Sequence, residues 1–174
     1  MRIGSVFLPE RGATDLLLAE VAAVLMAQGV VVAGAVQYSS GCAVNHCDMD
    51  LQVLPDGPII RISQNLGAGS TGCRLDAGAL EAAVMQVVAR LDGARLLLVN
   101  KFGKHEAEGR GFRALIADCL AEDMPVLIGI NSMNLAAFAA FSEGMAEVVA
   151  PDRAAILAWC ADALADNPNV KKGV

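Results

Sequence analysis

The start of this chain constrains its fold more than any other feature, because it alternates between strand-like and helix-like patterns. An apolar run at 2–8 and a short loop precede an apolar helical stretch at 14–28. Gly29 ends that stretch, and a β-branched run follows at 30–36. A strand, a helix and a second strand in this order form a βαβ unit, whose strands pair in parallel through a right-handed crossover. The chain is therefore predicted to be an α/β domain.

The rest of the chain repeats this alternation after an irregular insert at 37–76. The insert is rich in Ser, Gly, Asn and Asp, and we expect in it a hairpin that pairs 51–53 with 59–62. Asp76 is expected to cap the next helix. The patterns beyond it predict helices at 77–91, 109–121, 135–141 and 151–165 and strands at 95–99, 125–130 and 147–149. No linker divides these elements, so residues 1–174 are predicted to form one three-layer domain around a mainly parallel sheet.

Composition and charge exclude several classes of function. Hydrophobic residues make up 55% of the chain and aromatic residues 4%, which suits helices packed on a buried sheet. The net charge of −6 argues against nucleic acid as a partner. The longest apolar stretch, 16–36, is broken by Glu20 and Gly34, so no membrane span is expected, and the N-terminus lacks the pattern of a signal peptide. We therefore expect a cytoplasmic protein with reduced thiols, and a homodimer stays open.

The loop after the first strand has part of the phosphate-binding pattern G-x-x-x-x-G-K-[ST]. If Gly12 is the second glycine, Thr14 takes the hydroxyl position, but Ala13 stands in place of the lysine and Phe7 in place of the first glycine. Asp15 adds a carboxylate to the first helical turn, where it can satisfy the helix amides and repel a phosphate. Two interpretations stay open: Thr14 and Asp15 cap a helix, or this loop forms an anion cradle.

The stretch after the strand at 95–99 reads Asn-Lys-Phe-Gly-Lys-His-Glu. It resembles a loop of small bacterial and archaeal nucleoside triphosphatases, which reads Asp-Glu-Ile-Gly-Lys-Met-Glu. In that family the Asp holds magnesium through water and the Glu activates the attacking water. The resemblance places Asn100 and Lys101 at these two positions, while Gly103, Lys104 and Glu106 match. An amide binds a hydrated cation more weakly than a carboxylate, and a protonated lysine cannot act as a general base. Together with the missing loop lysine, these differences predict that hydrolysis by that route is lost.

Three motifs together are similar to an uncharacterised bacterial domain family of unknown function. They are Cys47-Asp48-Met49-Asp50-Leu51, Gly72-Cys73-Arg74-Leu75-Asp76 and the stretch 100–109. One member of that family is described as the ATP-binding part of a molybdenum transporter. The two resemblances imply a P-loop-NTPase-like fold, and the second suggests molybdenum handling.

The cysteines offer a different kind of site. Cys47, Cys73 and Asp50 are candidate metal ligands, and soft thiolates would favour zinc, copper(I) or a sulfur-bridged species. The alternative is that these cysteines are small buried hydrophobes. We expect that role of Cys119 and Cys160, which stand at inward helical positions.

A local basic group stands out on this acidic chain. Lys101, Lys104, Arg110 and Arg113 lie within one short segment. They can bind a nucleotide or an oxyanion such as molybdate through charged side chains and backbone amides. The alternative is a charged helix start balanced by neighbouring glutamates.

We favour a non-hydrolysing protein that binds a small anion or a protein partner, linked to molybdenum handling. Its candidate binding residues are Gly12, Thr14, Asp15, Asn100, Lys101, Gly103, Lys104, Glu106, Arg110 and Arg113. The alternatives are an active nucleoside triphosphatase with an unusual site, and a thiol metal-binding or redox protein that uses Cys47 and Cys73.

Overall fold

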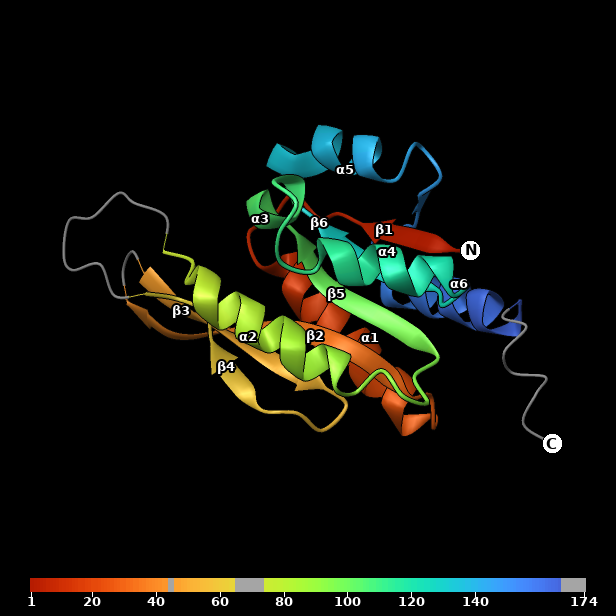
Figure 1. Cartoon of the computed structure of the whole chain (residues 1–174), viewed down its shortest axis with the longest axis horizontal. Coiled ribbons are helices and arrows are strands. Elements are labelled where there is room, and N and C mark those ends of the chain that lie inside the picture. The colour runs from red at the N-terminus through yellow and green to blue at the C-terminus, as the bar shows by residue number, and fades with distance from the viewer. Residues whose placement is uncertain (44–45, 65–73, 167–174) are drawn as a thin grey trace.

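The computed structural model describes residues 1–43, 46–64 and 74–166, and its centre is a single sheet (Figure 1). The strands are β1 (Ile3–Val6), β2 (Val32–Ala43), β3 (His46–Leu54), β4 (Ile59–Arg61), β5 (Leu96–Phe102), β6 (Val126–Ile130) and β7 (Glu147–Val148). The helices are α1 (Ala13–Ala27), α2 (Ala77–Val88), α3 (Lys104–Ala107), α4 (Arg113–Ala121), α5 (Leu135–Phe141) and α6 (Arg153–Ala165), with a 3₁₀ turn η1 (Ser132–Asn134) before α5.

The sheet is mainly parallel, as predicted. Its strand order in the described residues is β4-β3-β2-β5-β6-β1-β7. Every neighbouring pair from β2 to β7 is parallel, whereas β3 pairs antiparallel with both β2 and β4. The hairpin expected in the insert is confirmed, since Leu51 lies opposite Ile60 and Gln52 opposite Ile59. The insert therefore extends the parallel sheet with an antiparallel edge.

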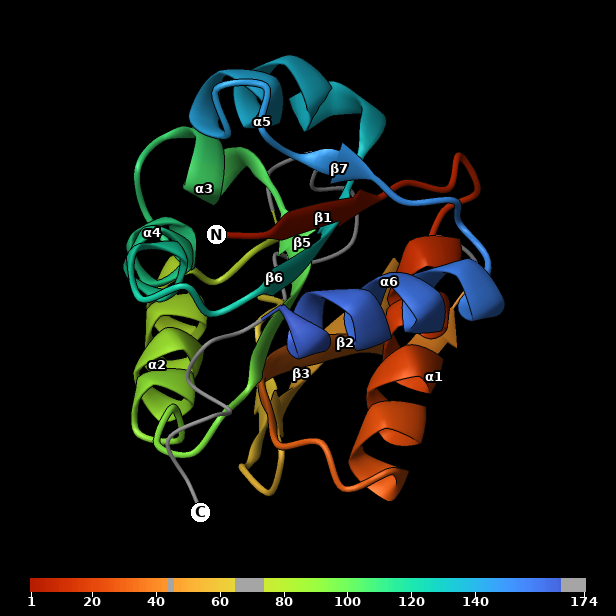
Figure 2. The ribbon, with the colours of Figure 1, turned by 90° about the vertical axis from the view of Figure 1, so that its right-hand side faces the viewer.

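Helices cover both faces of this sheet, so the predicted three layers are confirmed (Figure 2). The alternation of side chains along β5 shows why. Leu97 and Val99 pack with α2 and α4 on one face, while Leu96 and Leu98 pack with α1 and α6 on the other. A strand that is apolar at every position is buried on both sides, as a central parallel strand must be.

The first βαβ unit differs from its prediction in one respect. β1 and β2 are parallel strands of one sheet, but β6 and β5 lie between them, so they do not pair directly. All five residues of β6 and nearly all of β5 are buried. These two strands thus lie between β1 and β2 in the middle of the sheet.

Two strands are longer than predicted. β2 continues to Ala43, because its second half pairs with β3 over positions that read as a polar insert in the sequence. β5 continues to Phe102, so that Asn100 and Lys101 belong to a strand and not to a loop. Both extensions occur at the carboxyl ends of parallel strands, where ligands of α/β sheets bind.

Two helix starts also differ from prediction. A short α3 and a separate α4 replace the single helix expected at 109–121, because Gly109 and Gly111 have φ angles of 89° and 59° and interrupt the helix. α6 begins after Pro151, since the Asp152 side chain accepts a hydrogen bond from Ala155 N at 2.9 Å and caps the helix there. Asp76 caps α2 in the same way, as expected.

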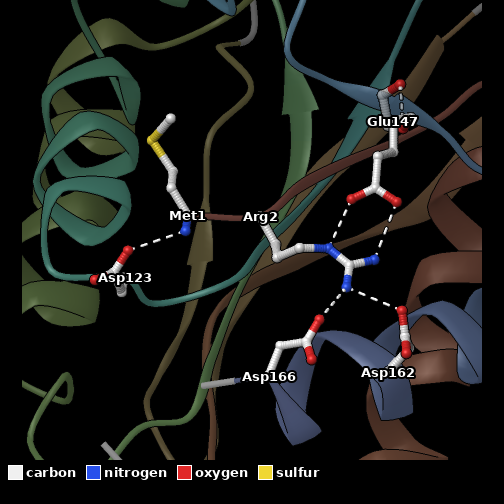
Figure 3. A network of polar contacts seen from close by, with 7 residues as sticks. Met1, Arg2, Asp123, Glu147, Asp162 and Asp166 are labelled. Carbon is white, nitrogen blue, oxygen red and sulfur yellow. Dashed lines mark hydrogen bonds and ion pairs between the residues drawn. The ribbon is translucent and has the colours of Figure 1, made fainter. Parts of the chain in front are cut away.

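The edge of the sheet near the N-terminus is held by exposed charges (Figure 3). The guanidinium of Arg2, which precedes β1, contacts Glu147 of β7 at 2.7 Å. It also contacts Asp162 and Asp166 of the α6 region at 2.9 Å each. These ion pairs connect the first residues of the chain to its last helix.

Candidate functional site

A pocket of about 860 Å³ opens at the carboxyl ends of the parallel strands. Its wall combines the start of α1, the ends of β2 and β5, the segment around α3, the turn η1 and the antiparallel edge. The lining residues are Arg11, Gly12, Asp15, Leu16, Gln37, Tyr38, Ser39, Met49, Leu51, Ile62, Arg74, Leu75, Leu80, Asn100, Lys101, Gly103, Lys104, His105, Glu106, Phe112, Asn131, Met133 and Asn134. Seven of the ten predicted binding residues are among them.

The loop between β1 and α1 is closed by a hydroxyl. Gly12 is the residue before α1 and has a φ of 79°, a conformation that glycine adopts readily. Thr14 is buried, and its Oγ1 accepts a hydrogen bond from Leu8 N at 3.0 Å. Its hydroxyl oxygen thus holds the loop in place. Thr14 is absent from the described lining of the pocket, unlike Gly12 and Asp15.

Asp15 is the centre of a buried polar cluster. Its carboxylate accepts hydrogen bonds from Asn100 Nδ2 at 2.9 Å and from Gln37 Nε2 at 3.3 Å. Lys101 Nζ lies 3.8 Å from Oδ1 of the same carboxylate. Asn100 Oδ1 in turn accepts from Gln37 N at 3.0 Å. We call Asp15, Gln37, Asn100 and Lys101 the Asp15 cluster.

The partners of Asp15 come from other elements of the fold. The sequence left open that this carboxylate satisfies the amides of its own helix, but the bonds that the structure gives it come from side chains of β2 and β5. The reason is burial: Asp15 is 6% exposed and faces the strand ends, where Asn100 and Gln37 are equally buried. The cluster ties the first helical turn of α1 to the two neighbouring strands.

Glu106 is a second buried carboxylate, and backbone N–H groups are its hydrogen-bond partners. Its Oε2 accepts from Gly103 N at 2.9 Å and its Oε1 from Phe112 N at 3.1 Å. The guanidinium of Arg113 donates to its backbone carbonyl at 3.2 Å. A Cβ on Gly111 would lie 2.2 Å from Oε1, so only glycine fits beside this carboxylate. Glu106 thus fixes the turn between β5 and α4.

The predicted basic group does not act as one face. Lys101 and Lys104 line the pocket, whereas Arg110 and Arg113 are not among its described lining residues. Arg110 pairs with Glu108, and this contact holds the pKa of that carboxyl below its usual range. The Arg113 guanidinium stacks 4.5 Å from the centre of the Phe141 ring.

Two arginines that were not predicted join the pocket. Arg11 and Arg74 line it, and neither has an ion pair or hydrogen bond from its guanidinium to another described residue. Lys104 is 80% exposed and pairs with Glu108 at 3.6 Å. Arg74 stands within one of the three family-like motifs, and that position is the signal by which sequence reasoning could have found it.

The proposed metal ligands are only partly within the described structure. Cys73 and the side chain of Cys47 lie outside the described residues. Asp50 belongs to β3 and forms an ion pair with Arg61 of β4 at 2.9 Å. In the parts of the chain that the structure describes, no three His, Cys, Asp or Glu side chains gather as a metal site. The thiol site stays a prediction.

The other two cysteines have the role expected of them. Cys119 and Cys160 are 4% and 0% exposed and pack in the two layers of the core. Burial raises the pKa of the Cys119 thiol to about 11 and that of Cys160 to about 12. Both are therefore protonated and inert near neutral pH.

A comparison of the whole chain with known families assigns it. Residues 3–159 match a family described as a protein of unknown function (DUF2478). The chain belongs to this DUF2478 family. Across its described residues, no helix combines the length and the apolar character that crossing a membrane requires.

One relative of this DUF2478 chain is named for a function. It is the molybdenum import ATP-binding protein ModC 2 of Bradyrhizobium diazoefficiens, 34% identical over 166 residues. The match covers 92% of this chain and 18% of that protein. The DUF2478 chain therefore spans less than a fifth of the relative's length.

Solved structures show the fold of the DUF2478 chain. The solution structure of a human cancer-related nucleoside triphosphatase matches with a TM-score of 0.60 and 16% identity, over 100% of both chains. The crystal structure of THEP1 from the hyperthermophile Aquifex aeolicus matches with a TM-score of 0.62 and 11% identity, over 95% of this chain and 99% of that one. The predicted P-loop-NTPase-like fold is confirmed.

Proposed function

We propose that this chain binds an anionic ligand, foremost a nucleotide, in the pocket at the strand ends and does not hydrolyse it. The Asp15 cluster carries this proposal. It fills the place beside the first helical turn of α1 with a carboxylate, two amides and a lysine that are bonded to one another. A hydrolase needs at this place groups that are free to hold a cation and to take a proton from water.

The charges around the pocket support binding of an anion. Arg11, Arg74, Lys101 and Lys104 line it, against the carboxylates of Asp15 and Glu106. Both carboxylates are buried and engaged by hydrogen bonds, while the two arginines have no described partner. Arginine suits phosphate and other oxyanions because its planar fork donates two parallel hydrogen bonds. The N-terminal end of α1 adds a favourable dipole.

The engaged groups support binding without hydrolysis. Both oxygens of Glu106 accept backbone N–H groups, and the Thr14 hydroxyl oxygen accepts from Leu8 N. The side-chain oxygen of Asn100 accepts a hydrogen bond from Gln37 N, and its amide nitrogen donates one to Asp15. An amide oxygen that already accepts a backbone bond fits poorly as the partner of a hydrated magnesium ion. Both carboxylates that line the pocket, Asp15 and Glu106, are thus already engaged as hydrogen-bond acceptors.

We propose that binding of this ligand is part of molybdenum handling. The curated relative that this chain matches is named for molybdenum import and ATP binding, and the match covers most of this chain. A nucleotide and molybdate are both oxyanions that guanidinium groups and helix amides recognise. The chain would then act as a binding or accessory domain that responds to one of them.

Calorimetric titration of the purified chain tests the proposal. ATP is titrated with magnesium and with EDTA, sodium molybdate is titrated separately, and phosphate release is followed in parallel. We expect binding of ATP or molybdate with phosphate release at background. Arg11→Ala and Arg74→Ala should each weaken binding by about tenfold, since each removes a charge-assisted contact.

Arg90→Ala is the matched control. Arg90 contacts Asp56 in the turn between β3 and β4, at the end of α2 remote from the pocket, so its loss should leave the affinity unchanged. The absence of heat with every anion would refute anion binding. Phosphate release above background that disappears in Lys104→Ala would replace this proposal by an active nucleoside triphosphatase.

A further inference from the structure

The pocket has two chemically different ends. The polar end consists of the start of α1, the end of β5 and η1, and carries the Asp15 cluster with Asn131 and Asn134. The other end consists of the antiparallel edge and α2, and its lining is apolar apart from Arg74. We infer that this apolar end binds the flat heterocycle of a phosphate ester, whose phosphate lies at the polar end. This inference rests on the proposed function and deepens it by naming the class of ligand.

The apolar wall is a continuous feature of the fold. Met49 and Leu51 are two apart on β3 and therefore share a face. Ile62 N donates to Met49 O at 2.9 Å, and Asp76 N donates to Ile62 O at 2.8 Å, so the ladder continues from β3 past β4 to the residues before α2. An isolated bridge between Ser63 and Leu75 brings Leu75 to the same place.

Two members of this wall offer apolar surface without belonging to the core itself. Leu51, Ile62, Leu80 and Phe112 are each at most 6% exposed and form the floor. Met49 and Leu75 are only partly buried and pack against the core from outside. Their remaining surface faces the pocket, where a ligand would cover it. Met49 is also well suited to a ligand wall, since its flexible thioether adapts to flat rings.

One group that stacks on rings lies at this end as well. Tyr38 lines the pocket from the other face of the sheet, because its cross-strand partner Asp50 alternates with Met49 and Leu51 along β3. Arg74 directly precedes Leu75, and its guanidinium has no described partner. A guanidinium plane stacks on flat heterocycles and also pairs with phosphate. An aliphatic chain would use neither property.

A bare oxyanion uses only part of this pocket. Molybdate or inorganic phosphate would engage the polar end and leave Met49 and Leu75 facing water. A phosphate ester of a flat heterocycle engages both ends of the 860 Å³ space. Two sources share this chemistry: a nucleotide and a phosphorylated coenzyme such as flavin mononucleotide.

Matched pairs of probes test the inference on the full chain. ATP is compared with inorganic tripolyphosphate, and flavin mononucleotide with inorganic phosphate, by calorimetry and by flavin fluorescence. We expect at least one heterocyclic probe to bind about tenfold or more tightly than its inorganic match. The pair that shows the difference identifies the source of the ring. Met49→Gln and Leu75→Gln should remove most of that difference and leave the inorganic probe unchanged.

The control is Met85→Gln, because Met85 lies on α2 with 65% of its surface exposed and is not among the described lining residues. Equal affinities within both pairs would overturn the inference while the proposed anion binding stands. Loss of ATP and tripolyphosphate binding together in Met49→Gln, with an unchanged melting temperature, would also overturn it. No binding of any probe refutes the proposed function, and with it this inference.

Discussion

Two polar clusters connect distant parts of this chain, and they differ in almost every respect. The Asp15 cluster joins α1, β2 and β5 at the carboxyl ends of the strands, where Asp15, Gln37 and Asn100 are each at most 8% exposed. The Arg2 cluster, which consists of Arg2, Glu147, Asp162 and Asp166, joins β1, β7 and the α6 region. Its carboxylates are 43% to 68% exposed.

The difference indicates where function lies. Water competes for exposed ion pairs, so the Arg2 cluster contributes little to stability although it has more charges. A buried carboxylate gains no net stability over an apolar residue, yet becomes costly once a partner is removed. This cost fits the proposal that Asp15 serves the pocket beside it and not stability.

The largest effect is expected for Asp15→Ala. This change removes the acceptor of the Asn100 and Gln37 amides and leaves both donors buried without it. The free energy of unfolding should fall by about 2–4 kcal/mol, as measured by urea denaturation. Asp162→Ala is the matched control in the Arg2 cluster and should cost at most about 0.5 kcal/mol. Equal losses for the two aspartates would break the contrast.

Glu106→Gln should have the next largest effect. The new amide can accept from only one of Gly103 N and Phe112 N, and its NH₂ group then faces the other donor. We expect a loss of about 1–3 kcal/mol in the same urea assay. The exposed Glu108→Gln in the same short segment loses only solvent-screened ion pairs and should lower stability much less. A neutral result for Glu106→Gln would mean that burial of a carboxylate does not decide how much stability its replacement costs.

The fold could be predicted from sequence wherever the residues of one segment are enough to determine its structure. The apolar run of β5, the helical spacing in α2 with its Asp76 cap, and the β3–β4 hairpin all follow from local residues. The strand order could not, because β1 pairs with β6, which lies far away in the chain, and only the complete fold brings the two together. The full length of β2 could not be predicted either. Its second half pairs antiparallel with β3, and such a pair tolerates polar residues such as Tyr38 and Ser39.

The site shows the same division. Asn100, Lys101 and Glu106 were found because they occupy one short segment that resembles a known loop. Gln37 was missed because its partner Asn100 is 63 residues away and only the sheet brings them together. The role of Thr14 was also hidden, since its bond to Leu8 N depends on how the loop folds back.

Arg2→Ala should have a smaller effect, of at most about 1 kcal/mol, that shrinks at high salt. Its hydrogen bonds to Glu147 lower the pKa of that carboxyl. A lowered folded pKa means that this stability is present above the ordinary glutamate pKa of 4.5 and is lost as the pH falls through the folded value. Melting temperatures of wild type and variant should therefore differ at pH 7 and converge in acid. A gap that persists at low pH and in high salt would contradict the assignment.

The smallest effect is expected for the N-terminal ion pair. The amino group of Met1 lies 2.9 Å from Asp123, and both groups are largely exposed, at 38% and 54%. Asp123 also has a φ of 59°, a conformation that asparagine tolerates as well as aspartate does. Asp123→Asn therefore removes the charge without straining the backbone, and stability should change by less than about 0.5 kcal/mol. Asp123→Val, which keeps neither property, should cost more because a β-branched residue is strained at positive φ. A large loss for Asp123→Asn in the urea assay would show that exposed charges at this edge contribute to stability after all, and the contrast with the Asp15 cluster would then be one of position and not of burial.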